Sequence, residues 1–164
     1  MKPILRTLSV LLAALTICLC FAACDGKGSA SALTFKTADG TEISIGAASD
    51  PIIEKLGNGV SAPLESASCG GFEGKDYVYT YQGFRISTTP AKDGQIVCKV
   101  ELTDDSVKSP EGLCIGMSRA DVEAAMKGFT AETVGDNLAY TVGGTKLQVS
   151  FRDGAVVGIV YVAA

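Results

Sequence analysis

Any chemistry in this chain has to be built without histidine, because the sequence contains none. A chain without histidine cannot form a Ser–His or Cys–His nucleophile pair and offers no imidazole to a metal ion. The most reactive side chains left are the six cysteines, and a thiol without an activating base is a poor catalyst. We therefore expect no catalytic residues, no metal site, no cofactor and no enzymatic activity.

Cys24 is the cysteine whose surroundings indicate covalent modification. Lys2 and Arg6 flank the start of an apolar stretch, residues 7–21, and two alanines stand directly before Cys24. This arrangement is typical of a signal peptide with a small-residue cleavage site. A cysteine at that point resembles the bacterial lipobox, in which the thiol receives a lipid before cleavage. We therefore expect cleavage before Cys24 and a lipid anchor on its sulfur.

The apolar stretch is also compatible with an uncleaved membrane helix or with simple secretion. A helix needs about 20 apolar residues to span a bilayer, and this stretch is shorter. The lipoprotein interpretation makes residues 1–23 a signal peptide and residues 24–34 a flexible Gly- and Ser-rich tether. It places the protein at the cell membrane, lipid-anchored and outside the cytoplasm.

Net charge excludes two classes of partner. Residues 1–23 contain two of the 14 basic side chains and none of the 18 acidic ones, which leaves 12 bases against 18 acids, or a formal charge of −6. Nucleic-acid binding depends on basic groups that neutralise phosphates, so we expect no nucleic-acid partner. Attachment to the membrane would depend on the lipid and not on a polybasic surface.

Three further cysteines, Cys69, Cys98 and Cys114, remain in the exported part of the chain. Export exposes them to oxidising conditions, so they are candidates for one disulfide, although their odd number leaves the pairing open. The alternative is that they are buried free thiols, because cysteine is often buried. Their spacing matches no zinc motif.

The exported sequence contains an internal repeat. Residues 45–56 align with residues 115–126 at an offset of 70, and residues 93–102 align with residues 153–162 at an offset of 60. Each copy predicts a short helix. Asp50 is the expected N-cap of the first helix, with Pro51 at the first helical position (N1). Ser118 is the expected N-cap of the second helix.

Alternating apolar residues and glycine-containing turns predict three strands after each helix. In the last strand of the first copy, Ile96, Cys98, Val100 and Leu102 share one face and are expected to point inward. The predicted strands span residues 77–81, 84–88 and 95–102 in the first copy, and 137–142, 145–151 and 155–162 in the second.

These elements predict an α+β fold of two tandem units. Each unit is a short helix followed by a three-stranded antiparallel meander, with the helices on one face of the sheet. The first unit spans residues 35–106 and the second residues 107–164. The two sheets are expected to run together or to pack side by side.

Two clusters of side chains are candidates for binding. Tyr77, Tyr79 and Tyr81 share one strand face and could form a protein-binding surface, since exposed aromatic residues are frequent hot spots; the alternative is core or cross-strand packing. Asp104 and Asp105 could contribute to a calcium site, but no run of further oxygen ligands follows them. A solvated turn is the favoured interpretation of this acidic pair.

Residues 112–122 carry a family resemblance. The sequence Gly-Leu-Cys-Ile-Gly-Met-Ser-Arg-Ala-Asp-Val resembles the opening motif of the outer-membrane assembly lipoproteins called BamE (SmpA/OmlA), and residues 151–156 resemble the aromatic hairpin of that family. The two-copy layout is similar to the beta-lactamase inhibitor proteins. In the first copy Ala47 and Ala48 replace the Met-Ser pair of the motif.

The resemblance implies a lipid-anchored envelope protein whose exposed sheet binds another protein without catalysis, in the manner of an inhibitor or an assembly factor. The alternative is an envelope protein that binds a small ligand or a cell-wall fragment. A protein-binding domain should present a broad sheet face, whereas a ligand-binding domain should contain a pocket of several hundred cubic ångströms.

Overall fold

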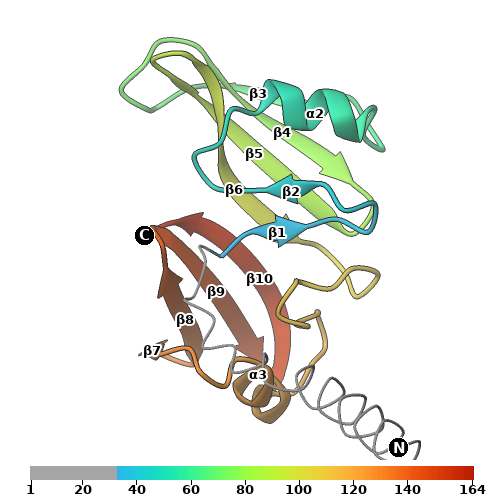
Figure 1. The fold of residues 1–164 in the computed structure, drawn as a ribbon, viewed down its shortest axis with the longest axis vertical. Helices are drawn as coiled ribbons and strands as arrows, with labels where there is room; N and C mark the ends of the chain where they lie inside the picture. Colours follow the sequence, from blue (N-terminus) through green and yellow to red (C-terminus); the bar gives the residue numbers. More distant parts are fainter. Residues whose placement is uncertain (1–32) are drawn as a thin grey trace, which may run out of the picture.

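A computed structural model describes residues 33–164 of the chain. The predicted signal peptide, Cys24 and most of the tether lie outside the described residues. Figure 1 shows a long twisted sheet with short helices and a small hairpin in front of it. The elements are β1 (Phe35–Lys36), β2 (Glu42–Ile43), α2 (Asp50–Leu56), β3 (Leu64–Ala67), β4 (Lys75–Tyr81), β5 (Phe84–Ala91), β6 (Gly94–Leu102), α3 (Arg119–Ala125), β7 (Ala131–Val134), β8 (Asn137–Val142), β9 (Thr145–Arg152) and β10 (Ala155–Ala163).

The predicted fold class is wrong. The described chain is mostly β, with an eight-stranded antiparallel sheet, a separate two-stranded sheet and two short helices, and it does not consist of two helix-plus-three-strand units. The prediction missed the edge strands β3 and β7. All four residues of each are exposed, so neither strand has the apolar alternation that marks a half-buried strand in a sequence.

The eight strands follow the order β3-β4-β5-β6-β10-β9-β8-β7. Each half of the chain thus contributes a four-stranded meander, and the last strands of the two meanders pair with each other. In that central pair Leu102 lies opposite Ile159 and Val100 lies opposite Tyr161. The two halves are therefore related by an approximate twofold axis that passes between Glu101 and Val160.

Hydrogen bonds before each helix confirm one part of the repeat and correct the other. Gly46 N donates to Val97 O, and Gly116 N donates to Val156 O, both at 2.8 Å. The two glycines are 70 residues apart, which confirms the first offset. Their acceptors, Val97 and Val156, are equivalent residues of the two halves and are 59 residues apart. The predicted offset of 60 is therefore wrong by one residue. A one-residue slip reverses which side chains of a strand face the core.

The inward-facing residues of β6 differ from the prediction because the strand contains a bulge. The register shifts between Ser87 and Thr88 of β5, which leaves Cys98 without an opposite residue. A bulge interrupts the alternation of side chains between the two faces. Val97, Val100 and Leu102 are consequently buried, whereas Ile96 and Cys98 are only half-buried.

The helices begin near the expected residues. Ser118 is the N-cap of α3, and its Oγ accepts from Asp121 N at 3.2 Å, as predicted. The N-cap of α2 is Ser49 and not Asp50, because Asp50 already belongs to the helix. α2 ends at Leu56, and its C-cap Gly57 has a φ of 69°, which suits glycine.

One continuous core lies between the sheet and the elements in front of it. Phe35 of β1 lies 5.2 Å from Phe84 and 6.1 Å from Tyr161, measured between ring centroids, so it connects the two halves. Val122 and Met126 at α3 are buried in the same core, and the apolar residues of α2 pack against it. Every covering element therefore lies on one face of the sheet.

Candidate functional site

The opposite face of the sheet is uncovered, and we call it the bare face. Cross-strand pairing defines its two central rungs, which run across both halves. Each rung is a row of residues paired from strand to strand. One rung consists of Thr80, Arg85, Glu101, Val160, Gln148 and Ala139, and the other of Val78, Ser87, Lys99, Val162, Lys146 and Thr141. Only Ala139 of these twelve residues is buried.

The bare face combines apolar and charged groups near the twofold axis. Val160 and Val162 lie at the centre, half-exposed. Lys99 is 3.3 Å from Glu101, and Lys146 of β9 is 4.0 Å from Glu132 of the edge strand β7, across β8. These ion pairs are substantially exposed, so each contributes little to stability. Such charges remain available to meet a partner surface.

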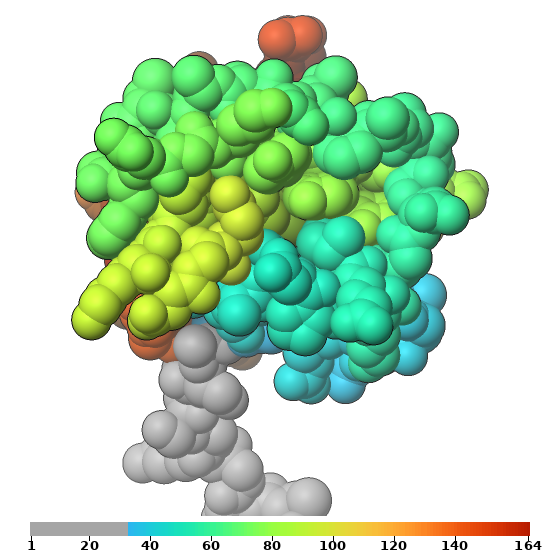
Figure 2. Space-filling view, turned by 90° about the horizontal axis from the view of Figure 1, so that it is seen from above, coloured from blue at the N-terminus to red at the C-terminus, as the bar shows by residue number. Residues whose placement is uncertain are grey.

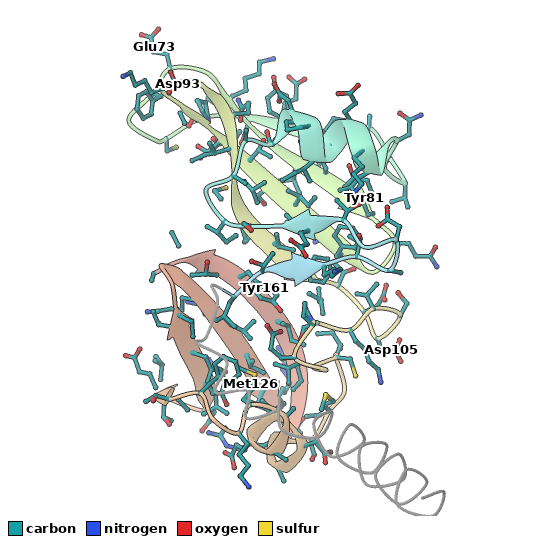
Figure 3. All side chains as sticks on the ribbon, in the orientation of Figure 1. Glu73, Tyr81, Asp93, Asp105, Met126 and Tyr161 are labelled. Carbon is teal, nitrogen blue, oxygen red and sulfur yellow. The ribbon has the colours of Figure 1, made fainter. Side chains whose placement is uncertain are left out.

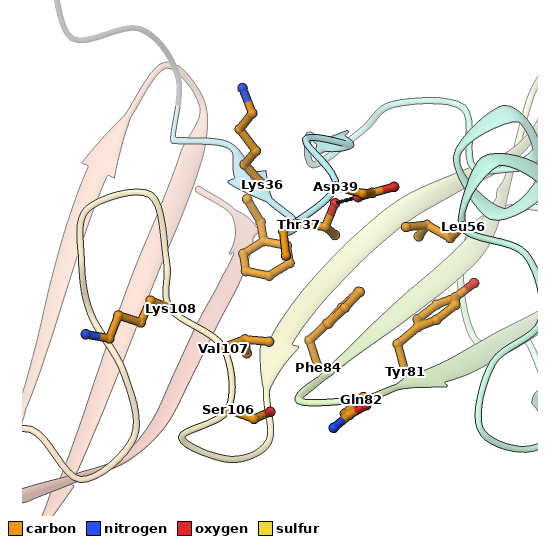
Figure 4. Close-up of a pocket in the computed structure, with 12 residues that line it drawn as sticks. Lys36, Thr37, Asp39, Leu56, Tyr81, Gln82, Phe84, Ser106, Val107 and Lys108 are labelled. Atoms are coloured by element: carbon orange, nitrogen blue, oxygen red, sulfur yellow. Dashed lines mark hydrogen bonds between the residues drawn. The ribbon is translucent and has the colours of Figure 1, made fainter.

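The covered face contains an aromatic pocket of about 460 Å³ in the first half. Its floor consists of Phe35, Tyr81 and Phe84, and the ring centroids of Tyr81 and Phe84 are 5.1 Å apart in a stacked arrangement. Leu56 and Val107 provide aliphatic walls. Figure 4 shows these side chains converging on the cavity from α2, from the β4–β5 hairpin and from the loop after β6.

Charged side chains stand at the margin of the aromatic pocket and not inside it. The ammonium groups of Lys36 and Lys108 point away from the rings in Figure 4. Asp39 accepts hydrogen bonds from Thr37 Oγ1 and from the backbone and hydroxyl of Thr41. These bonds, that from Thr37 first, hold the pKa of the Asp39 carboxyl below its usual value of 3.8.

The three tyrosines proposed as a binding face lie on the covered face. Tyr77, Tyr79 and Tyr81 pair with Thr88, Ile86 and Phe84 of β5, all of which are buried. Tyr81 is itself 9% exposed, and its hydroxyl donates to Gly57 O at 3.4 Å. Tyr77 and Tyr79 keep part of their rings accessible, with centroids 6.1 Å apart.

Burial raises the pKa of Tyr79, and the neighbouring Tyr77 adds to the shift. Tyr79 also lines a cavity of about 480 Å³ with Ile53 and the loop after α2. The tyrosines therefore face α2 and its loop, on the opposite side of the sheet from the bare face.

The cysteines Cys69, Cys98 and Cys114 are all free in the structure. Cys69 is exposed in the β3–β4 loop, which also contains Glu73 at one end of the molecule (Figure 3). Cys98 is half-buried at its bulge, where its thiol lies 3.3 Å from Ser87 O. Burial raises the pKa of the Cys98 thiol, and the negative charge of Asp76 raises it further. This thiol is therefore not activated as a nucleophile.

The acidic pair after β6 forms a solvated turn, as predicted. Asp104 Oδ1 accepts from Ser106 N at 2.8 Å, and both carboxylates are exposed. Hydrogen bonds from Ser106 lower the pKa of Asp104. Within residues 33–164 no three acidic, cysteine or histidine side chains are grouped closely enough to hold a metal ion.

No family model, curated protein or solved structure matches this chain. The resemblance to BamE and to the beta-lactamase inhibitor proteins thus depends on short motifs alone. Within the described part of the chain, neither helix has the length and apolar character needed to cross a bilayer.

Sequence reasoning missed the residues that make the two surfaces. Phe84 lies in a predicted strand, but Phe35 and Val107 come from segments without periodicity. The bare face could have been found from the residues that alternate with the tyrosines, such as Val78 and Thr80, because side chains on one strand point alternately to two faces.

Proposed function

We propose that this protein is a lipid-anchored envelope protein that binds another protein through the bare face, without catalysis. The observation that carries the proposal is a continuous sheet face across both halves that no element of residues 33–164 covers. Antiparallel sheets can leave one face to solvent, and a face with apolar residues at its centre and charges around them has the composition of a protein interface.

The arrangement of apolar and basic residues on the bare face also supports partner binding. Val160 and Val162 lie on the strand that joins the halves, with Arg85, Lys99 and Lys146 around them. Residues near the centre of an interface contribute most of the affinity, and the surrounding charges orient the partner. The motif resemblance of residues 112–122 agrees with partner binding on an exposed sheet.

Photo-crosslinking tests the bare face directly. A photoreactive amino acid at Val160 should form crosslinks to one envelope protein in intact cells. The matched control is the same residue at Ala124, which is exposed on α3 on the other side of the sheet. Equal crosslinking from both positions, or none from Val160, would show that the bare face is not the binding surface.

Affinity for the crosslinked protein provides the second measurement. Val160→Arg places a long charged side chain at the centre of the bare face and should weaken binding by about tenfold or more. Ala124→Arg should leave the dissociation constant unchanged. A shift of both variants by the same factor would contradict a localised interface.

The lipid anchor has its own test. Cys24→Ala should abolish incorporation of radiolabelled palmitate and release the protein from the membrane fraction, whereas Cys69→Ala should alter neither. Retention and labelling in the Cys24→Ala variant would contradict lipid attachment at that residue. This outcome would leave the bare face as a separate question.

A second function, binding of a small ligand, is favoured by the aromatic pocket. Its volume of about 460 Å³ lies within the range of roughly 300–1,000 Å³ that ligand pockets occupy.

A further inference from the structure

We infer that the aromatic pocket binds the apolar tail of a single-chain anionic amphiphile, such as a long-chain carboxylate. This inference goes beyond the protein-binding proposal, since the pocket lies on the covered face and the partner surface on the bare face. The two can therefore succeed or fail independently.

The interior of the pocket selects for apolar groups. Phe35, Tyr81 and Phe84 are the floor, with Leu56 and Val107 as walls. The hydroxyl of Tyr81 is directed to Gly57 O, so it offers little to a ligand. The two buried side-chain atoms without a partner in residues 33–164 belong to Thr88 and Gln95, and neither residue lines this pocket. The rings and aliphatic side chains recognise hydrocarbon, whereas the polar lining residues Gln82 and Ser106 are exposed to solvent.

The margin of the pocket selects for a negative headgroup. Two lysines and one aspartate line it, and the Asp39 carboxylate is already occupied by Thr37 and Thr41. Lys36 Nζ already forms an ion pair with Glu42 Oε1 at 3.4 Å. Lys108 is exposed and takes part in no ion pair within the described part of the chain. A carboxylate at the mouth could therefore pair with Lys108 while its chain enters the pocket.

The loop that carries Lys108 is held in place by a close contact. A Cβ added to Gly83 would lie 2.5 Å from Ser106 Oγ and 2.7 Å from Val107 Cγ1, so only glycine at the β4–β5 turn lets this loop approach. Thr103 N donates to Gly83 O at 2.9 Å. The wall of the pocket is thus fixed before a ligand arrives, which reduces the entropy lost on binding.

Calorimetric titration with dodecanoate below its micelle concentration tests the inference, with dodecyl maltoside as the neutral amphiphile of equal chain length. We expect saturable binding of dodecanoate with one site and at least about tenfold weaker binding of the maltoside. Equal affinity for the two would overturn the anionic headgroup, and no saturable binding of dodecanoate would overturn the site.

Two pairs of variants locate the binding. Val107→Trp fills the pocket and should weaken dodecanoate binding by about tenfold or more, whereas Val134→Trp, on the exposed edge strand β7, should bind as the wild type does. Lys108→Ala should weaken binding by about threefold to tenfold, and Lys92→Ala, on the β5–β6 turn, should not. Equal effects within either pair would contradict binding in this pocket.

A measurement on the unmodified protein covers the case in which Val107→Trp does not fold. In NMR spectra, dodecanoate should shift the ring resonances of Phe35 and Phe84 and leave those of Phe151 in the second half unchanged. Shifts confined to residues of the bare face would overturn the pocket as the site. Shifts of the pocket resonances caused instead by an aromatic peptide, but not by dodecanoate, would replace the lipid-like ligand with a protein side chain.

Discussion

Tyr81 and Tyr140 occupy equivalent positions in the two halves, yet their surroundings differ. Tyr81 lies opposite Phe84, which lies opposite Leu102, and Tyr140 lies opposite Leu147, which lies opposite Tyr161. Tyr81 borders the aromatic pocket, whereas Tyr140 is 2% exposed in the core.

The difference originates in the lengths of two hairpins. β4 turns into β5 immediately after the Tyr81–Phe84 pair, whereas β8 and β9 continue beyond Tyr140 with the further pair Val142–Thr145. Thr145 is only 4% exposed, and Val142 packs against the core. The same strand order therefore surrounds Tyr140 with core in the second half and leaves Tyr81 beside an open pocket in the first.

The largest expected difference between the halves is the cost of removing these rings. Tyr140→Ala should lower the free energy of unfolding by about 3–5 kcal/mol, because it leaves a sealed cavity. Tyr81→Ala should cost about 2–3 kcal/mol, since it only enlarges a pocket that water already reaches. Urea denaturation followed by circular dichroism measures both. Equal costs would contradict the distinction between a closed and an open half.

Gly83 and Gly144 are turn glycines with nearly the same backbone angle but different surroundings. Gly83 has φ of 82° and a crowded neighbourhood, whereas Gly144 has φ of 81° and no neighbouring atom within 4 Å of an added Cβ. Gly144→Ala should cost about 1 kcal/mol from backbone strain alone. Gly83→Ala should cost about 2–3 kcal/mol, because strain and overpacking add. Thermal unfolding of the two variants checks the order, which a smaller loss for Gly83→Ala would reverse.

Tyr161 and Leu102 occupy equivalent positions in the two halves, but only Tyr161 can lose a proton at alkaline pH. Burial raises the pKa of Tyr161, and Glu111, which accepts from its hydroxyl at 2.7 Å, raises it further. The folded state thus holds a proton that the unfolded state releases near pH 10, so stability from this group is present below pH 10 and declines above it.

When the pH is raised from neutral to above 10, the free energy of unfolding should fall less for Tyr161→Phe than for the wild type. At neutral pH it should cost about 1 kcal/mol, because the half-exposed Glu111 can hydrogen-bond to water instead. Urea midpoints measured across this pH range provide the test. Parallel curves for the two proteins would show that Tyr161 does not titrate differently in the folded and unfolded states.

The smallest expected effect concerns the helix caps. Ser118 Oγ accepts from Asp121 N, whereas Ser49 makes no side-chain cap bond at α2. Ser118→Ala should lower the free energy of unfolding by about 1 kcal/mol. Ser49 is buried, but Ser49→Ala should lower it by less than Ser118→Ala, because no cap hydrogen bond is lost and alanine fits the same space. A larger loss for Ser49→Ala than for Ser118→Ala would contradict this assignment of the caps.

Local features of this protein could be predicted from its sequence because they depend on neighbouring residues. The hairpin of residues 137–142 and 145–151 was placed to within one residue, since Gly143 and Gly144 permit a tight turn between alternating strands. The cap of α3 was found for the same reason: Ser118 and the amide that it accepts from are three residues apart.

Features that depend on distant contacts were decided only by the tertiary structure. β3 and β7 are strands because a neighbouring strand supplies hydrogen bonds, and the bulge at Cys98 exists because β5 is one residue short at that point. The same holds for the pairing of β6 with β10, which selects the face that remains bare, and for the approach of Phe35 to Phe84. Sequence periodicity describes one segment at a time, whereas burial is a property of segments that meet in space.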